Sequence, residues 1–417
     1  MKIMINTCLL LFGLGLFFTT RSGEFKAACI EIDITPDKPV WLSGFGSRDK
    51  PSTGVHDPLF LKVLCMSDGL TYFYLISSDI VNAPYDEQFV SKLEQEGIPK
   101  RQVMWTATHT HSGPSFRKEN DGYKENIQNI CIQAMIKARS RLIPAKIGYT
   151  SSIALANMNR RVQYPDRFFL GKNPNGVMDR ELGVIKILDE NDTLISLVVN
   201  YAMHGTTLYG KNYETSADAM GVVTEYVKNK LNAPVMYVNG ACGNLDPIYA
   251  YRDTFQQENH FDINAFQFLL GRAVLTAQQM VTNATADVSL HTGLKTISLP
   301  RDTTKNPRNP QDSGENIQVD VQFLGINNLL VFSAPLELFN DVAMYIKDHS
   351  PFDETFYFGY CNGSKGYLTT KKAFEDGGYE IRVTPYTARA EEQFYEGIMT
   401  HIQTVHETWS NSSNQTK

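Results

Sequence analysis

The stretch Gln102-Val-Met-Trp-Thr-Ala-Thr-His-Thr-His-Ser-Gly-Pro114 carries an apolar segment into two histidines and a Gly-Pro break. The run from Gln102 to Thr108 is rich in apolar, aromatic and β-branched residues and predicts a strand. In an extended chain residues i and i+2 share a face, so His109 and His111 would project together from the end of that strand. Two imidazoles on one face form half of a transition-metal site, but such pairs also occur by chance on exposed strands. The stretch alone leaves both interpretations open.

Predicted strands and helices alternate on both sides of this stretch. Apolar runs predict strands at 59–66, 70–81, 102–108, 183–188, 194–202, 234–238 and 328–333. Apolar residues at helical spacing predict helices at 85–96, 123–142, 217–231, 261–280 and 337–347. Such alternation is typical of an α/β fold, here with a mixed β-sheet core covered by helices. We expect one catalytic domain over residues 24–409, with a loop at 300–314 and a flexible Ser/Asn-rich tail at 410–417.

Residues 1–23 have the pattern of a secretory signal peptide. Lys2 gives a positive start, an apolar run extends from Cys8 to Phe18, and small or polar residues follow as far as Gly23. The apolar run is shorter than the roughly 20 residues that span a bilayer, although an uncleaved anchor stays an alternative. We expect an exported protein, periplasmic or secreted, with no transmembrane segment after cleavage.

Charge and cysteine content narrow the class of protein further. The 417-residue chain has a formal net charge of −6, which gives no electrostatic basis for binding nucleic acid. Cys8 belongs to the predicted signal peptide, and the remaining five cysteines are widely spaced without a CxxC motif. This arrangement predicts small buried residues, with one disulfide still allowed. The sequence leaves the oligomeric state open.

His204, Asp246 and Glu337 each follow a predicted strand. Ligands of α/β proteins bind at the carboxyl ends of strands, so these positions reinforce the histidine pair. Each also has a simpler explanation: a structural histidine, a glycine-rich turn, and a glutamate favoured by the dipole in the first turn of a helix. Cys242 in the glycine-rich turn has the chemistry of a nucleophile, but no base adjacent in sequence would activate it.

The chain resembles the catalytic N-terminal domain of the neutral/alkaline (non-lysosomal) ceramidases, which are zinc amidases that cleave the N-acyl bond of ceramide. The stretch Ala107-Thr-His-Thr-His-Ser-Gly-Pro114 matches the most specific motif of this family. Weaker matches follow in the family's order: Ile32-Asp-Ile-Thr-Pro36, Gly54-Val-His56, Ser78-Asp79 and Asn159-Arg160. The resemblance extends from about Cys29 to beyond Tyr379, nearly the whole predicted mature chain.

This resemblance implies a zinc site and a set of catalytic residues. The zinc ligands implied by family position are His109, His204, Glu337 and Tyr367. Zinc held in this way activates a water molecule for attack on a carbonyl group. His111 and Tyr379 have the chemistry to donate hydrogen bonds to the oxyanion, and Arg160 to orient the substrate or Asp246. The same ligand types also suit manganese or iron.

The chain departs from the family pattern in two places. Gly243-Asn-Leu-Asp-Pro247 aligns with the family's Gly-Asp-Val-Ser-Pro, so Asp246 replaces the family's serine. A carboxylate excludes a covalent acyl-serine route, but it can act as a general base or bind amine and hydroxyl groups. The chain also ends before the family's immunoglobulin-like C-terminal domain would fit. We expect the fold and the metal site to survive both changes.

Three functions remain for this sequence. The first is an exported zinc-dependent hydrolase of the ceramidase type that cleaves the N-acyl amide bond of a ceramide-like lipid. The second is the same zinc fold acting on a glycan, a glycoconjugate or an ester, because the Asp246 carboxylate suits a hydroxylated substrate. The third is a non-catalytic binding protein in which the metal is a structural cross-link. The expected partner is a small-molecule, lipid or glycoconjugate substrate.

Overall fold

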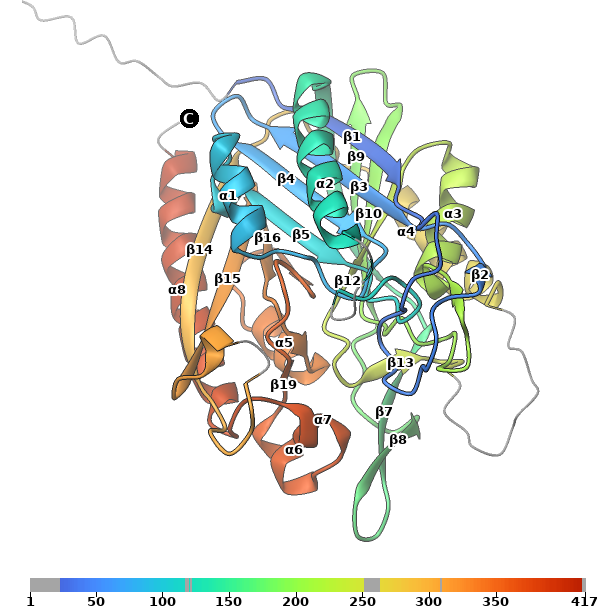
Figure 1. Ribbon diagram of the computed structural model, residues 1–417. Helices are drawn as coiled ribbons and strands as arrows, with labels where there is room; N and C mark the ends of the chain where they lie inside the picture. Colours follow the sequence, from blue (N-terminus) through green and yellow to red (C-terminus); the bar gives the residue numbers. More distant parts are fainter. Residues whose placement is uncertain (1–22, 117–119, 121, 251–262, 308–309, 415–417) are drawn as a thin grey trace, which may run out of the picture.

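Two β-sheets pack face to face, and helices cover their outer sides (Figure 1). This computed structural model describes residues 23–116, 120, 122–250, 263–307 and 310–414. The expected signal peptide lies outside the described residues, apart from Gly23. The predicted α/β class and mixed sheet are confirmed, because both sheets contain parallel and antiparallel pairs of strands.

The larger sheet has eight strands in the order β12-β10-β9-β6-β1-β3-β4-β5. Their bounds are Lys26–Asp33 (β1), Phe60–Ser67 (β3), Tyr72–Ser78 (β4), Val103–Ala107 (β5), Ile143–Ile153 (β6), Glu181–Asp189 (β9), Leu194–Tyr201 (β10) and Val235–Asn239 (β12). β4 pairs with β5, and β10 with β12, in parallel, whereas the strands between them pair antiparallel. Each edge of the sheet is therefore a parallel pair.

The smaller sheet and three short ones complete the strand structure. The smaller sheet has the order β14 (Leu290–Pro300), β15 (Asn316–Ile326), β16 (Leu329–Ser333) and β18 (Glu354–Phe358). The short sheets pair β2 (Gly54–Val55) with β11 (Glu214–Thr215), β7 (Asn157–Gln163) with β8 (Phe168–Asn173) and β13 (Leu245–Pro247), and β17 (Glu337–Leu338) with β19 (Tyr367–Leu368). The sheet of β7, β8 and β13 and the sheet of β17 and β19 each join segments that are far apart in the sequence.

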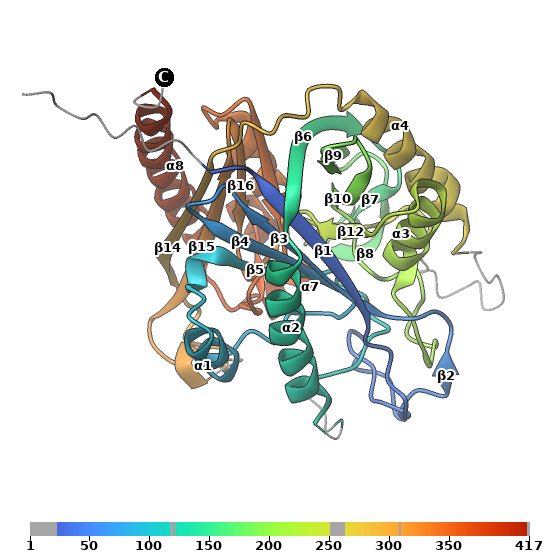
Figure 2. The same cartoon turned by 90° about the horizontal axis from the view of Figure 1, so that it is seen from above.

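The long helices lie on the outer faces of the two large sheets. The larger sheet is covered by α1 (Glu87–Gln95), α2 (Tyr123–Ser140), α3 (Asp218–Leu231) and α4 (Arg272–Met280), of which α3 and α4 lie beside β9 and β10 (Figure 2). The smaller sheet is covered by α5 (Asn340–Asp348) and α8 (Ala390–Asn414). The short helices are η1 (Lys100–Gln102), a π-helix η2 (Gln267–Gly271), η3 (Pro310–Asp312), α6 (Lys371–Asp376) and α7 (Tyr379–Val383).

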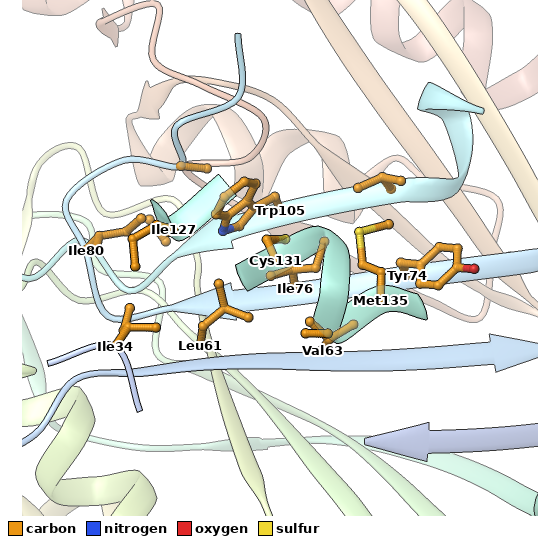
Figure 3. Packing of buried hydrophobic residues seen from close by; sticks show 14 of the residues in the cluster. Ile34, Leu61, Val63, Tyr74, Ile76, Ile80, Trp105, Ile127, Cys131 and Met135 are labelled. Atoms are coloured by element: carbon orange, nitrogen blue, oxygen red, sulfur yellow. The ribbon is translucent and has the colours of Figure 1, made fainter. Parts of the chain in front are cut away.

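Alternation along each strand fills two separate cores. In β3, Val63 faces α2, whereas its neighbour Leu64 faces the smaller sheet. Figure 3 shows Cys131 and Met135 of α2 packed over Ile76 and Val63 of the sheet. Burying such a side chain contributes roughly 1.5–3 kcal/mol, so these layers hold the strand ends in fixed positions.

Two predicted elements differ from the structure. Glu337 lies in β17, and the helix after it begins only at Asn340, so the explanation of Glu337 as a first-turn glutamate is wrong. Parallel pairing of Glu337 with Tyr367 holds this backbone extended where propensity alone favoured a helix. At the C-terminus α8 continues to Asn414, so the expected flexible tail begins as helix.

The described residues contain neither a disulfide nor a helix that could cross a membrane. All five cysteines in the described residues are free: Cys29, Cys65, Cys131, Cys242 and Cys361. All but Cys29 are buried. Within the described part of the chain, every helix is too short or too polar to cross a bilayer.

Candidate metal centre

The two edges of the larger sheet meet at one buried asparagine. Asn239, the last residue of β12, donates from Nδ2 to the carbonyl of Thr108 beyond β5 (3.0 Å) and to that of Met203 beyond β10 (2.8 Å). Its Oδ1 accepts from the backbone N–H of Met203 at 3.0 Å. His109 and His204 directly follow the two residues that Asn239 binds. One side chain thereby fixes the backbones that present both histidines.

His109 does not have the extended backbone that the sequence argument assumed. Its φ is +64°, in the left-handed region that a non-glycine residue adopts only where its surroundings impose it. The alternation argument for His109 and His111 is therefore wrong in its premise. Their rings nevertheless converge, because Thr110 forms a parallel bridge with Gly205 and the His111 N–H donates to the Gly205 carbonyl at 2.8 Å.

Gly205 permits this approach of the two histidine segments. A Cβ at Gly205 would lie 2.4 Å from the carbonyl oxygen of His109 and 2.6 Å from the Cα of Thr110. Gly243 has the same role at the next contact, where a Cβ would lie 2.6 Å from the Glu337 carbonyl oxygen. Gly243, in the glycine-rich turn noted in the sequence, therefore admits the backbone of β17.

Both buried imidazoles are fixed by main-chain carbonyls. The Nδ1 of His109 lies 2.6 Å from the Val81 carbonyl oxygen, and the Nδ1 of His204 lies 2.7 Å from that of Cys242. A carbonyl only accepts, so each Nδ1 carries the proton and each Nε2 presents a lone pair. Fixing the outer nitrogen in this way is the usual support for a metal-ligating histidine.

The inward nitrogens converge on a small space beside one carboxylate. The ligand atoms of His109, His111 and His204 lie within 4.8 Å of one another, and the Nε2 atoms of His109 and His111 are 3.3 Å apart. The Oε2 of Glu337 lies 3.6 Å from the Nε2 of His109 and 3.7 Å from that of His204. The Nε2 of His204 is buried and has no hydrogen-bond partner among the described residues. These four side chains have the donor set of a transition-metal site.

Electrostatics favour the ionised form of Glu337. Burial alone would raise the pKa of this carboxyl, but its interactions with His109 and His204 outweigh burial and hold the pKa well below its usual range. Burial keeps the pKa of His204 low, at about 4, assisted by the positive charge of Arg160. The centre therefore holds the Glu337 carboxylate beside a neutral His204 imidazole, which is the protonation state that binds a cation.

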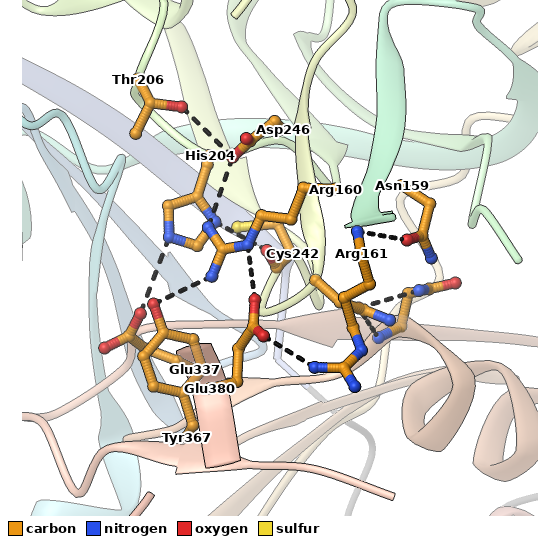
Figure 4. A network of polar contacts seen from close by, with 12 residues as sticks. Asn159, Arg160, Arg161, His204, Thr206, Cys242, Asp246, Glu337, Tyr367 and Glu380 are labelled. Carbon is orange, nitrogen blue, oxygen red and sulfur yellow. Dashed lines mark hydrogen bonds and ion pairs between the residues drawn. The ribbon is translucent and has the colours of Figure 1, made fainter. Parts of the chain in front are cut away.

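Arg160 joins Tyr367 and Asp246, which the sequence singled out, to Glu380, which it did not, as Figure 4 shows. It donates from Nη2 to the Tyr367 hydroxyl at 3.1 Å, from Nη1 to Oδ1 of Asp246 at 3.3 Å, and from Nε to Oε1 of Glu380 at 2.9 Å. Thr206 also donates to Oδ1 of Asp246, at 3.4 Å. Arg160, Asp246 and Glu380 are all buried, so these charge-assisted hydrogen bonds are poorly screened by solvent. They fix the relative positions of the three side chains on one side of the centre.

The remaining sequence candidates line the same region. Tyr367 pairs with Glu337 between β17 and β19, and burial raises the pKa of its hydroxyl well above the usual value. Tyr379 is 36% exposed, and its ring stands edge-on to that of Tyr367 with centroids 6.1 Å apart. The structure thus brings all eight sequence candidates together: His109, His111, Arg160, His204, Asp246, Glu337, Tyr367 and Tyr379.

Sequence reasoning missed the residues that support the centre from behind. Tyr360 stacks on the His109 ring, and its hydroxyl lies 3.0 Å from Sγ of Cys242, whose carbonyl holds His204. Burial raises the pKa of the Cys242 thiol far above its usual value, so Cys242 is a neutral support and not a nucleophile. Glu380 and Asn239 were also missed. A polar residue at the end of a strand was the only available signal for Asn239.

Fold and site together define an α/β protein with a buried imidazole–carboxylate centre where several strands end. The crystal structure of neutral ceramidase from Pseudomonas aeruginosa has the same fold, with a TM-score of 0.74 and 16% sequence identity over 90% of this chain and 73% of that one. A ceramidase structure described as complexed with C2 superimposes equally well, with a TM-score of 0.74 over 89% of this chain.

The family follows from the sequence itself. Residues 27–242, more than half of the chain, match the model of the family described as neutral/alkaline non-lysosomal ceramidase, N-terminal. The chain belongs to this family.

Two curated relatives show how far the similarity extends. The neutral ceramidase of Pseudomonas aeruginosa is 24% identical over 274 residues, which is 58% of this chain and 40% of the relative. Neutral ceramidase B of Dictyostelium discoideum is 26% identical over 151 residues, which is 32% of this chain and 20% of the relative. The matched part of this chain thus spans less than half the length of either relative.

Proposed function

We propose that this protein is an exported, zinc-dependent amidase that cleaves the N-acyl bond of a ceramide-like lipid. The observation that carries the proposal is the convergence of His109, His111 and His204 within 4.8 Å beside the Glu337 carboxylate. Family membership supports the reaction class. The N-terminal sequence pattern of residues 1–23 supports export.

The residues present fit a divalent metal ion. The fit rests on the unpartnered buried Nε2 of His204 and on Nδ1 protons held by main-chain carbonyls at His109 and His204. In this proposal His109, His204 and Glu337 hold the ion, with His111 or Tyr367 completing the set. A zinc ion there supplies Lewis-acid chemistry, polarising a carbonyl and lowering the pKa of a water towards about 7.

The protein's own side chains would position the amide and move protons. Tyr379 is partly exposed beside Tyr367, so its hydroxyl is available to donate to the developing oxyanion, a contribution typically worth about 3 kcal/mol. Asp246 is the carboxylate placed to accept a proton, with Arg160 holding one of its oxygens. Arg160 itself is fixed by Glu380 and so keeps Asp246 in one orientation.

Hydrolysis and metal content measured on the same preparations test the proposal. We expect the wild-type protein to carry zinc and to cleave a fluorescent ceramide. His204→Ala should lose both the metal and more than about a hundredfold of the activity, because a buried ligand disappears. His349→Ala removes an exposed histidine at the end of α5, whose ring stacks on Tyr345, and should retain both. Full activity in metal-stripped protein would refute the proposal.

Asp246 supports a second candidate, hydrolysis of a glycan, glycoconjugate or ester on the same centre. Its buried carboxylate, bound by Arg160 and Thr206, suits amine or hydroxyl groups better than a hydrocarbon chain. Zinc-loaded wild-type protein that leaves ceramide intact, while Asp246→Ser gains ceramide hydrolysis, would favour this candidate. Zinc loading without turnover on acyl or glycosyl substrates by either form would favour a binding protein with a structural metal.

A further inference from the structure

The hairpin formed by β7 and β8 projects beyond the rest of the chain (Figure 1). Its base carries Arg160, which reaches Asp246 and Tyr367 in the candidate metal centre. Its far end carries exposed aromatic residues: Tyr164 is 53% and Phe169 is 40% exposed. The two ends of the hairpin therefore lie in different environments: the base is buried in the centre, and the far end is exposed and aromatic.

The exposed aromatic residues lie on the same face of the hairpin as Val162. Phe169 pairs directly with Val162, and its ring meets that of Tyr164 edge-on at 5.1 Å. The pair formed by Gln163 and Phe168 lies on the other face, where the Arg161 guanidinium lies over the Phe168 ring. One face near the end of the hairpin therefore carries Val162, Tyr164 and Phe169.

Further apolar exposure lies around the base of the hairpin. The flanking residues Ile153, Leu155 and Val177 are 71%, 54% and 50% exposed. An accumulation of large exposed apolar side chains over one short segment marks a surface that meets a partner. Exposed apolar side chains are unfavourable in water, also in a chain with a formal net charge of −6. We therefore expect a partner to cover this surface.

The charges at the end of the hairpin indicate which partner. Arg167 and Lys172 are exposed cations beside the aromatic residues, against the single exposed carboxylate of Asp166. The Arg167 guanidinium lies 4.5 Å from the centre of the Phe169 ring. Aromatic rings combined with arginine and lysine are the composition that enters the interface of an anionic bilayer, where rings sit at headgroup level and cations meet phosphates.

We propose that the end of this hairpin, made of Tyr164, Arg167, Phe169 and Lys172, docks the protein on an anionic phospholipid surface. This inference rests on the proposed lipid substrate, because docking there places the hairpin whose base carries Arg160 against the bilayer. Gly171 lets the Val162 side chain pack closely on the hairpin backbone, since a Cβ there would lie 2.8 Å from that side chain.

Sedimentation with vesicles tests docking without reference to catalysis. The probes are phosphatidylcholine vesicles with and without phosphatidylglycerol, and we expect the full chain to bind the anionic vesicles more tightly. Tyr164→Ser combined with Phe169→Ser should weaken this binding at least about tenfold. Arg167→Glu combined with Lys172→Glu should weaken it similarly, since each cation near an anionic surface is worth about fivefold.

A matched control and a second substrate separate docking from the proposed reaction. Leu70→Ser removes a 69% exposed apolar residue from the turn between β3 and β4 and should leave vesicle binding unchanged. The hairpin variants should lose hydrolysis of vesicle-embedded ceramide while keeping that of a water-soluble short-chain amide. Unchanged vesicle binding in both hairpin variants would overturn the docking proposal. Hairpin-dependent binding by a protein that hydrolyses no amide would sustain docking and refute the proposed function.

Discussion

The ring of Tyr360 stacks on the imidazole of His109, with centroids 3.9 Å apart and planes inclined by 25°. Tyr360 is itself held in a left-handed conformation, with φ +54°, directly after β18 and Gly359. Its hydroxyl reaches Cys242, which supports His204 through its carbonyl. A single tyrosine that follows a strand of the smaller sheet thus contacts His109 itself and the residue that supports His204.

Replacing this tyrosine should weaken metal binding as well as stability. In Tyr360→Leu the His109 ring loses its packing surface, and we expect metal affinity to fall roughly ten- to a hundredfold, as for other supports behind a ligand. Titration with Co²⁺, followed by its visible absorption, measures the affinity and reports the ligand geometry. Tyr360→Phe keeps the stacked ring and should restore most of the affinity.

A tyrosine in the same core provides the control for this experiment. Tyr74 is fully buried and belongs to the cluster that also contains Tyr360 and Cys242. Tyr74→Leu should cost a similar few kcal/mol of folding free energy through the cavity it leaves. If it lowers Co²⁺ affinity as much as Tyr360→Leu does, the tyrosine beside His109 acts only through stability.

The buried amide of Asn239 should be costly to remove, both for stability and for metal binding. Asn239→Leu removes three hydrogen bonds and leaves the buried backbone groups of Thr108 and Met203 unpaired, so we expect a loss of about 3 kcal/mol or more. Metal affinity should fall with it, because both histidine segments lose their common anchor. Urea unfolding and Co²⁺ titration give the two quantities.

Asn200 offers a matched substitution in the neighbouring strand. Its Nδ2 donates to the carbonyls of Val238 and Tyr357, and it touches neither histidine segment. Asn200→Leu should therefore lower stability but leave the affinity for Co²⁺ within about twofold of wild type. Equal losses of affinity in the two variants would show that Asn239 has no special link to the histidines.

Individual strands were predictable from local pattern, whereas the convergence of His109 and His111 was expected from an extended backbone that His109 does not have. The apolar run before His109 predicted β5 well, because a buried strand leaves its signal in consecutive residues. The meeting of β5 with β12 left no such signal, since these edges lie more than a hundred residues apart and meet through one amide. The same limit explains Glu380, whose arginine partners are 219 and 220 residues away.

The buried carboxyl of Asp79 should make stability fall as pH rises through the acidic range. Burial raises the pKa of Asp79 to about 6, against a usual value near 3.8, even though Lys62 and the Phe60 N–H oppose this shift. Between these pH values the folded protein keeps a proton that the unfolded chain releases. The free energy of unfolding therefore falls with rising pH, by about 3 kcal/mol in total from this group.

Comparison of Asp79→Asn with wild type isolates that contribution. The amide does not ionise, so the variant should gain stability relative to wild type from pH 4 to pH 7, as measured by urea unfolding at several pH values. Asp86→Asn should show the opposite trend, because the Lys124 and Phe89 N–H hydrogen bonds outweigh burial and lower the pKa of Asp86. Parallel pH profiles for Asp79→Asn and wild type would contradict the prediction.

Glu380 is the charge that keeps two arginines side by side in the wall of the centre. It accepts from Arg160 at 2.9 Å and from Arg161 at 2.8 Å, and all three side chains are buried. Glu380→Gln leaves the buried Arg161 without its ion-pair partner and Arg160 paired with Asp246 alone, so we expect a loss of about 3–5 kcal/mol in the free energy of unfolding. Adding Arg161→Gln to this variant removes the unpaired charge of Arg161. The double variant should therefore unfold at a higher urea concentration than Glu380→Gln alone, although Arg161→Gln alone is destabilising. A double variant that loses the sum of the two single losses would show that the three charges do not act as a unit.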